Sequence, residues 1–127
     1  MPNLTFTDDG LGWLARRAFD PETTEGPALS LAIGSGNTTP SASETALVSE
    51  TARAAATFEE VSPGVFKLTA EFAAGVGTGV VAEAGIFDDE DDEEGTLIAR
   101  VLVGPFEKGA GAIYTLELPV TLRDENA

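Results

Sequence analysis

The chain has 127 residues, of which 43% are hydrophobic, and a formal net charge of −15 from 22 acidic and 7 basic residues. This length suits a single domain, residues 1–127, built around one core. The absence of cysteine and histidine excludes disulfides, thiolate metal sites and histidine-dependent triads or zinc centres, while the negative charge disfavours nucleic acid and anionic membranes as partners.

The excess of carboxylates over lysines indicates a halophilic origin. A carboxylate-rich surface stays hydrated in concentrated salt, where self-repulsion is screened within about 3 Å at 1 M. An ordinary acidic protein with its charge in one loop is the alternative, but removing the 7 acids at 88–94 would still leave a negative chain. The N-terminus has no signal-peptide pattern, and no apolar run approaches the roughly 18 residues of a membrane span. We therefore expect synthesis in the cytoplasm and no membrane partner.

The first element, over residues 7–19, is predicted to be a helix. Thr7 or the two acids after it can cap its start, and Pro21 ends it. Trp13 lies off the centre of its apolar stripe, which predicts that this side chain edges the core or contacts a neighbouring subunit. The residues of the stripe recur at helical spacing and are Leu11, Leu14, Ala15, Ala18 and Phe19.

Short apolar segments with period-two alternation fill the rest of the chain and predict strands. They are residues 28–33, 53–61, 65–72, 78–87, 96–103 and 114–122. Residues 34–40 are predicted to form a Gly/Asn/Pro loop, with a plain turn at Gly34-Ser35-Gly36. Residues 41–48 are predicted to form a loop or a single helical turn, with Ala46 and Leu47 packing down. Pro119 removes a backbone donor from the last strand, which predicts an edge position or a bulge. The predicted fold class is mainly β, an antiparallel β-sandwich or open barrel of about six strands over 28–122 with one N-terminal α-helix.

Strands 78–87 and 96–103 form the predicted central hairpin. The second strand is apolar enough to be buried on both faces, so we expect the hairpin to lie inside a larger sheet. Alternation in the first strand separates two faces, with Val80, Ala82, Ala84 and Ile86 on one and Val81, Glu83, Gly85 and Phe87 on the other. In strand 53–61 the alternation places Ala54, Ala56 and Phe58 on one face.

An acidic loop at 88–95 joins the two strands of this hairpin. Calcium needs about six to eight converging oxygens, which a spaced D-x-[DN]-x-[DN]-G loop provides. Consecutive acids would instead point apart, so a solvated tip that attracts cations nonspecifically is the preferred interpretation. No cofactor and no metal site is predicted, and the weak candidate ligands are Asp88, Asp89, Asp91 and Asp92.

Glu83 is unusual because it lies in the middle of an apolar strand. A buried glutamate must be hydrogen-bonded, paired with a cation or protonated. Arg100 in the neighbouring strand and Arg53 are the predicted partners, and they would make a structural ion pair. A histidine-free enzyme that uses Glu83 with a shifted pKa is the less favoured alternative. No catalytic residue is predicted.

Several segments together resemble a family of small structural proteins of tailed viruses, the modules found in tail, baseplate and collar-fibre proteins. A strand with a glycine turn leads to a Glu-Thr-Ala-Leu and a Glu-Thr-Ala-Arg segment, and a Glu-Ala-Gly-Ile-Phe strand pairs with a Gly-Thr-Leu-Ile-Ala-Arg strand. These pieces are residues 31–36, Pro40, 44–47, 50–53, 81–87 and 95–100. The resemblance spans roughly residues 28–103, and the acidic insertion between Phe87 and Gly95 departs from the short turn usual in the family.

The resemblance implies a virion structural protein without enzymatic activity. Together with the halophilic composition, it implies a tailed virus of a haloarchaeon, with the protein made in the host cytoplasm and placed in the tail, the baseplate or a capsid vertex turret. Virion rings and spikes are symmetric, so the implied partners are copies of the chain in a homo-oligomer and other virion proteins. The assembly interface would lie on the helix, at Leu11, Trp13, Leu14 and Arg17.

The competing hypothesis is a free-standing β-sandwich module of a halophile that binds a carbohydrate or a peptide. Such a module would be a monomer with a concave site lined by aromatic side chains. The chain offers few of them, namely Trp13, Tyr114 and 7 phenylalanines, which favours the structural hypothesis.

Overall fold

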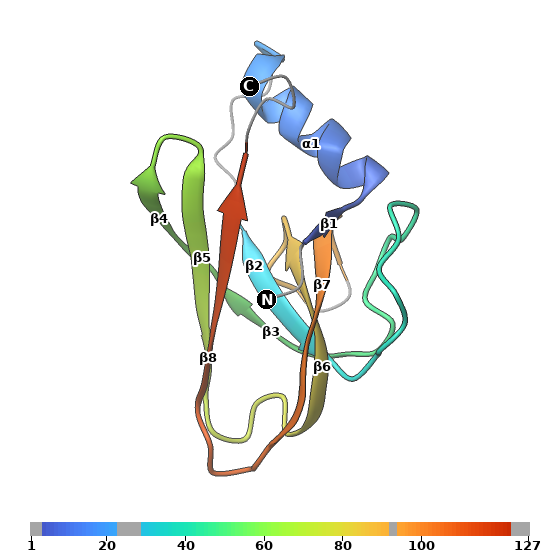
Figure 1. Ribbon diagram of the computed structural model, residues 1–127, viewed down its shortest axis with the longest axis vertical. Coiled ribbons are helices and arrows are strands. Elements are labelled where there is room, and N and C mark those ends of the chain that lie inside the picture. Colours follow the sequence, from blue (N-terminus) through green and yellow to red (C-terminus); the bar gives the residue numbers. More distant parts are fainter. Residues whose placement is uncertain (1–3, 23–28, 92–93, 123–127) are drawn as a thin grey trace.

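The computed structural model of the chain describes residues 4–22, 29–91 and 94–122. These residues form two antiparallel sheets, of five and three strands, and one helix (Figure 1). The sheets face each other as a sandwich and, over the described residues, do not close into a barrel. The elements are β1 (Thr5–Phe6), α1 (Asp8–Phe19), β2 (Ser30–Gly34), β3 (Glu50–Ala55), β4 (Thr57–Ser62), β5 (Val65–Phe72), β6 (Gly79–Phe87), β7 (Leu97–Lys108) and β8 (Tyr114–Thr121).

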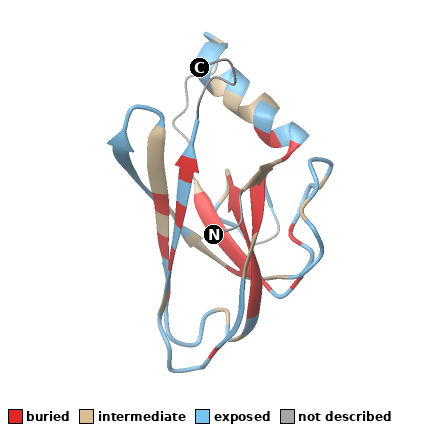
Figure 2. Cartoon of the chain, viewed as in Figure 1, coloured by how far each residue is buried: buried red, intermediate tan, exposed pale blue. Residues whose placement is uncertain are grey.

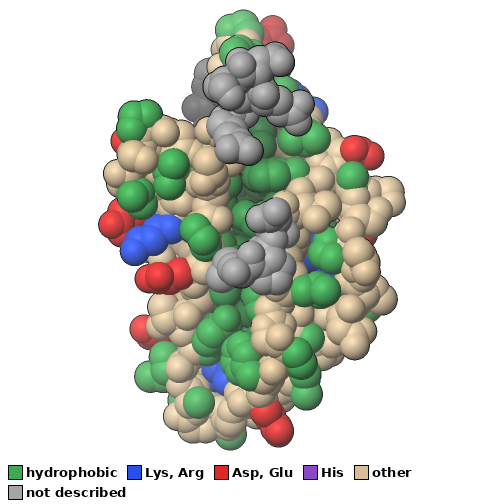
Figure 3. Space-filling model, viewed as in Figure 1, with side chains coloured by type: hydrophobic (Ala, Val, Ile, Leu, Met, Phe, Trp, Pro, Cys, Tyr) green, Lys and Arg blue, Asp and Glu red, His purple; other side chains and the backbone are tan. Residues whose placement is uncertain are grey.

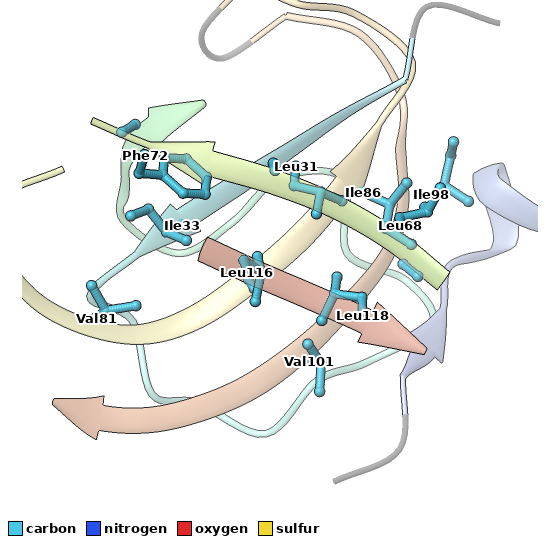
Figure 4. Close-up of a cluster of buried hydrophobic side chains, with 14 of the residues drawn as sticks. Leu31, Ile33, Leu68, Phe72, Val81, Ile86, Ile98, Val101, Leu116 and Leu118 are labelled. Atoms are coloured by element: carbon cyan, nitrogen blue, oxygen red, sulfur yellow. The ribbon is translucent and has the colours of Figure 1, made fainter. Parts of the chain in front are cut away.

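The five-stranded sheet has the order β1-β7-β6-β2-β3, and the three-stranded sheet has the order β4-β5-β8. The central position predicted for the β6–β7 hairpin is confirmed, because β7 and β6 are flanked by β1 and β2. Buried residues concentrate on β2, β6 and β7 (Figure 2). The core between the sheets is apolar, and Figure 4 shows its side chains meeting from both sheets, among them Leu31, Ile33, Leu68, Phe72, Ile86, Val101, Leu116 and Leu118.

The alternation predicted for the last strands is confirmed. In β5 and β8 every second side chain enters the core, namely Leu68, Ala70, Phe72, Leu116, Leu118 and Val120. Pro119 lies in β8, an edge strand of the smaller sheet, where its missing donor interrupts no pairing with a further strand. In the loop before β3, Leu47 is buried as predicted, whereas Ala46 is exposed.

The single strand predicted over 53–61 is wrong, because the chain changes sheets in the middle of it. β3 ends at Ala55 and β4 begins at Thr57, in the other sheet. Between the two strands the Ala56 amide donates to the carbonyl of Leu29, the residue before β2, at 3.0 Å. Phe58 was expected on a core face, but it lies on the edge strand β4 and is 63% exposed.

Strand β7 continues past its predicted end at Val103 to Lys108, and its pairing with β6 contains a bulge. Val81 pairs with Phe106 and Glu83 pairs with Leu102, so residues 103–105 lie opposite Ala82 alone. The register of β6 against β7 is irregular between Val81 and Glu83, and Val81 joins the core between the sheets instead of sharing the face of Glu83.

The helix was predicted correctly, but the face it buries was not. Thr7 caps α1 by accepting from the Gly10 amide at 2.8 Å. Gly10 packs directly on Ile98 of β7, because a Cβ at this position would lie 2.6 Å from the Ile98 Cα. This close approach turns the predicted stripe outward, so that Leu11 is 53% and Phe19 86% exposed. The other exposed members of the stripe are Ala15 and Ala18.

Candidate functional site

Glu83 lies in β6 on the face of the five-stranded sheet that points away from the smaller sheet. The loop over residues 35–49, here called the covering loop, folds across it. Gly34 and Gly36 leave room for the carboxylate, because a Cβ at either position would lie 2.7 or 2.6 Å from Glu83 Oε2. The Gly-Ser-Gly segment, predicted to be a plain turn, is therefore part of a binding pocket for a glutamate side chain.

Four donors converge on the Glu83 carboxylate, which is fully buried. The backbone amides of Gly36, Val48 and Ser49 donate at 2.8, 2.9 and 2.8 Å. Arg100 Nε donates to Oε1 at 2.9 Å. Burial alone would raise the pKa of Glu83, but the hydrogen bonds from Ser49, Val48, Arg100 and Gly36 together hold it below its ordinary value of 4.5. The carboxylate is therefore ionised at neutral pH.

Arg100 carries the positive charge of this buried pair. Its terminal nitrogen Nη1 donates to the Thr38 carbonyl at 2.9 Å and to Glu44 Oε1 at 3.3 Å. The other terminal nitrogen is buried and has no acceptor among the described residues. Thr38 and Glu44 belong to the covering loop, as do the three residues whose amides donate to Glu83. Arg100 and Glu83 therefore hold both the first and the last part of this loop against the sheet.

Arg53 forms a separate cluster and does not contact Glu83, unlike the prediction. It pairs with Glu50 through two hydrogen bonds of 2.9 and 2.8 Å. Its guanidinium lies 3.8 Å from the centre of the Phe87 ring and donates to the carbonyls of Asp89 and Glu94 at 2.9 and 2.7 Å. Arg53 therefore fixes the two ends of the acidic loop to β3.

The ends of the acidic loop are held by hydrogen bonds. Asp88 Oδ1 accepts from the Thr96 amide at 2.6 Å, and the Asp89 carbonyl accepts from Ser30 Oγ at 2.5 Å. Glu90 is exposed. Over residues 4–22, 29–91 and 94–122, no group of three or more acids is placed to hold a metal ion. Asp92, a predicted weak ligand, lies outside the described residues.

This arrangement supports a structural role for Glu83. General acid–base work needs a carboxyl group that reaches the substrate and exchanges a proton near the working pH. Glu83 is instead sealed under the covering loop, and its two oxygens accept four hydrogen bonds from the protein. Its lowered pKa keeps it ionised at neutral pH.

The residues predicted to form an assembly interface divide between the two faces of α1. Trp13 and Leu14 point inward and line an apolar pocket of about 50 Å³ beneath the helix. The Arg17 guanidinium lies 5.1 Å from the centre of the Trp13 ring, also on the inner side. Only Leu11 of the four faces solvent, in one row with Ala15 and Phe19.

A groove lies at the open side of the sandwich, between β7 and β8. It holds about 370 Å³, and Phe106 and Tyr114 meet in it edge to face at 4.9 Å between ring centres. Burial raises the pKa of Tyr114. Figure 3 shows hydrophobic side chains along the opening between the two sheets. Pro105 and Pro119 lie in the flanking strands, so an added strand would miss backbone donors at both.

Comparison with known proteins gives no relative, since no protein-family model, curated protein or solved structure matches the chain. Within the described part of the chain, no helix has the length and apolar character that crossing a membrane requires.

Proposed function

We propose that this protein is a non-enzymatic structural protein that works by assembling with copies of itself. The observation that carries the proposal is the exposed row of Leu11, Ala15 and Phe19 on α1. An apolar row at helical spacing normally faces a core, and scattered exposed apolar residues are common whereas a row on one helix face is not. Burial of this row in an assembly would remove it from water.

The rest of the molecule supports the same proposal. Its most buried polar cluster, around Glu83 and Arg100, fastens the covering loop to the sheet and keeps both of these charged groups away from solvent. A rigid module with a fixed surface is what a repeated building block needs. The surface charge keeps such a block soluble in concentrated salt and apart from nucleic acid.

Within this class we place the protein in the virion of a tailed virus, through the resemblance of residues 28–103 to small tail, baseplate and collar-fibre modules. A symmetric homo-oligomer in the tail, the baseplate or a capsid vertex fits a chain whose helix presents an apolar row at one end of the sandwich (Figure 1). The other partners would be further virion proteins, and the acidic surface indicates a haloarchaeal host.

The groove between β7 and β8 favours a second candidate, the monomeric module that binds a carbohydrate or a peptide. Phe106 and Tyr114 supply aromatic surface there, and Glu117 and Thr115 supply polar groups beside it. This site has the concave, partly aromatic lining that a ligand-binding module requires.

Light scattering during size-exclusion chromatography, in salt of about 2–3 M, separates the two candidates. The structural proposal predicts a defined particle whose mass is a multiple of 13.1 kDa. A chain that stays at 13.1 kDa and melts at a higher temperature with an oligosaccharide or peptide bound would support the module and overturn the structural proposal.

A further inference from the structure

We propose that two copies of the chain associate through α1, with the outer faces of the two helices packed against each other in antiparallel orientation about a two-fold axis. The outer face of α1 is defined here as the seven exposed residues of the helix, namely Asp8, Asp9, Leu11, Ala15, Arg16, Ala18 and Phe19. This inference rests on the proposed self-assembly and adds the surface, the orientation and the symmetry of the contact.

The outer face of α1 is shaped for close approach by another helix. Leu11 and Phe19 are 53% and 86% exposed, and two alanines, Ala15 and Ala18, lie along the same face. The distance between packed helices depends on the size of the side chains at the contact, and alanines keep it short. A second α1 would therefore cover the apolar row of the first and remove both rows from water.

The charges of α1 make this face complementary to a reversed copy of itself. Asp8 and Asp9 lie in the first turn, and Arg16 and Arg17 lie in the last turn. In an antiparallel pair with Asp9 level with Arg16 of the other copy, Asp8 also lies within one turn of that arginine. The two-fold axis repeats this pairing at the other end of the contact. A parallel pair would instead bring acids to acids and arginines to arginines.

α1 is also the part of the surface where two acidic copies repel each other least. Two acids and two arginines cancel within Asp8–Phe19, so the rest of the chain carries the whole net charge of −15. Outside α1, three of the cations in the described part of the chain are buried, and Lys67 bridges two acids of its own copy. Arg16 is exposed and makes no ion pair with a described residue, so it can meet the carboxylates of a second copy.

The proposed contact is short and closes on itself. A helix of 12 residues is about 18 Å long, so the contact is smaller than that of a tight dimer. We therefore expect a species of twice 13.1 kDa that dissociates on dilution. Because both copies use the same surface, this contact alone adds no third copy.

Charge reversal at the two ends of α1 tests the pairing. Asp9→Arg leaves arginines at both ends of the contact and Arg16→Asp leaves acids at both. Each variant should therefore self-associate about tenfold or more weakly than the wild type in about 0.15 M salt. Glu60→Arg, at an exposed position of β4, is the matched control and should not weaken association. Circular dichroism verifies that the chains are folded, and sedimentation measures their mass.

Phe19→Glu tests the apolar part of the same contact. It should weaken self-association about tenfold or more in about 2 M salt, because the loss of apolar burial does not depend on unscreened charge. The effect of the two charge reversals should shrink in the same salt. Phe19 is 86% exposed, so the substitution leaves the core unchanged.

Mixing the two charge-reversal variants gives the decisive result. The mixture should form a one-to-one dimer in about 0.15 M salt, because both ends of the mixed contact then pair an arginine with an aspartate. Charge reversals that do not weaken association, or weakened variants that do not associate on mixing, overturn the antiparallel pairing. Wild-type assembly that none of the α1 variants weakens overturns this inference and leaves the proposed function intact, whereas a wild type that is monomeric in about 2 M salt overturns both.

Discussion

The carboxylate of Glu83 in β6 and the guanidinium of Arg100 in β7 meet at 2.9 Å, and both side chains are fully buried. The pair lies on the outward face of the sheet, where a loop rather than the second sheet covers it. Its remaining hydrogen bonds go to that loop, four of them to backbone groups and one to the Glu44 carboxylate. The pair therefore connects the loop to the sheet, and its removal should loosen the loop and lower the stability of the fold.

Glu83→Gln should lower the free energy of unfolding by about 3–5 kcal/mol, because it removes the fully buried counter-charge of Arg100 and leaves only the partly exposed Glu44 carboxylate at 3.3 Å. Either orientation of the glutamine also places its amide nitrogen against an N–H donor, since both carboxylate oxygens of Glu83 accept from donors. Denaturant unfolding in high salt measures the change. Glu59→Gln, which removes an exposed bridge to Lys67, should change stability by about 1 kcal/mol or less, and equal effects of the two substitutions would contradict the account.

The stability that Glu83 contributes should depend on pH in the acidic range. Because its folded pKa lies below the ordinary 4.5, the unfolded chain binds this proton more tightly. The contribution is complete above pH 4.5 and is lost as the pH falls through the folded pKa. The stability difference between wild type and Glu83→Gln should therefore shrink as the pH falls below 4.5 and through the folded pKa. A difference that stays constant over this range would show that Glu83 does not titrate as the structure indicates.

Gly10 and Gly12 of α1 should respond in opposite ways to alanine. A Cβ at position 10 would lie 2.6 Å from the Ile98 Cα, so Gly10→Ala should push the helix off β7 and destabilise the protein. A Cβ at position 12 meets only the Arg16 side chain, at 3.3 Å, so Gly12→Ala should raise stability by up to about 1 kcal/mol through helix propensity. Thermal melting of both variants measures the contrast. A Gly10→Ala variant as stable as wild type would disprove the close contact.

The acidic loop should tolerate substitution at its exposed part and not at its base. Asp88→Ala removes the acceptor of the Thr96 amide and should cost about 1–3 kcal/mol. Glu90→Gln, at an exposed position, should leave the unfolding free energy within about 0.5 kcal/mol. Chemical denaturation of the two variants compares them, and an Asp88→Ala chain with wild-type stability would show that the hydrogen bond to Thr96 does not hold the base of the loop.

The elements that sequence patterns predicted well each have one face in the core. The alternation in β5 and β8 survives in the structure because a strand with one buried face can be paired in only one register. Thr7 was found as a cap because its hydrogen bond to Gly10 is local. Glu83 and Arg100 were found because charged residues interrupt apolar strands, and such residues need partners.

The features that were missed depend on contacts between distant parts of the chain. The buried face of α1 is chosen by Gly10 against Ile98, which no periodicity within the helix reveals. The amides of Val48 and Ser49 reach Glu83 from a loop about 35 residues away, and backbone donors carry no sequence signal. The crossing at Ala56 and the bulge before Phe106 interrupt strands that read as continuous.

Self-assembly is tested most directly by the mass of the wild-type chain in solution. Sedimentation equilibrium measures this mass over a range of concentrations in about 2 M salt, where charge repulsion between copies is screened. It predicts a discrete species at an integer multiple of 13.1 kDa, which Phe19→Glu converts to the monomer. A wild-type mass of 13.1 kDa at every concentration would contradict it.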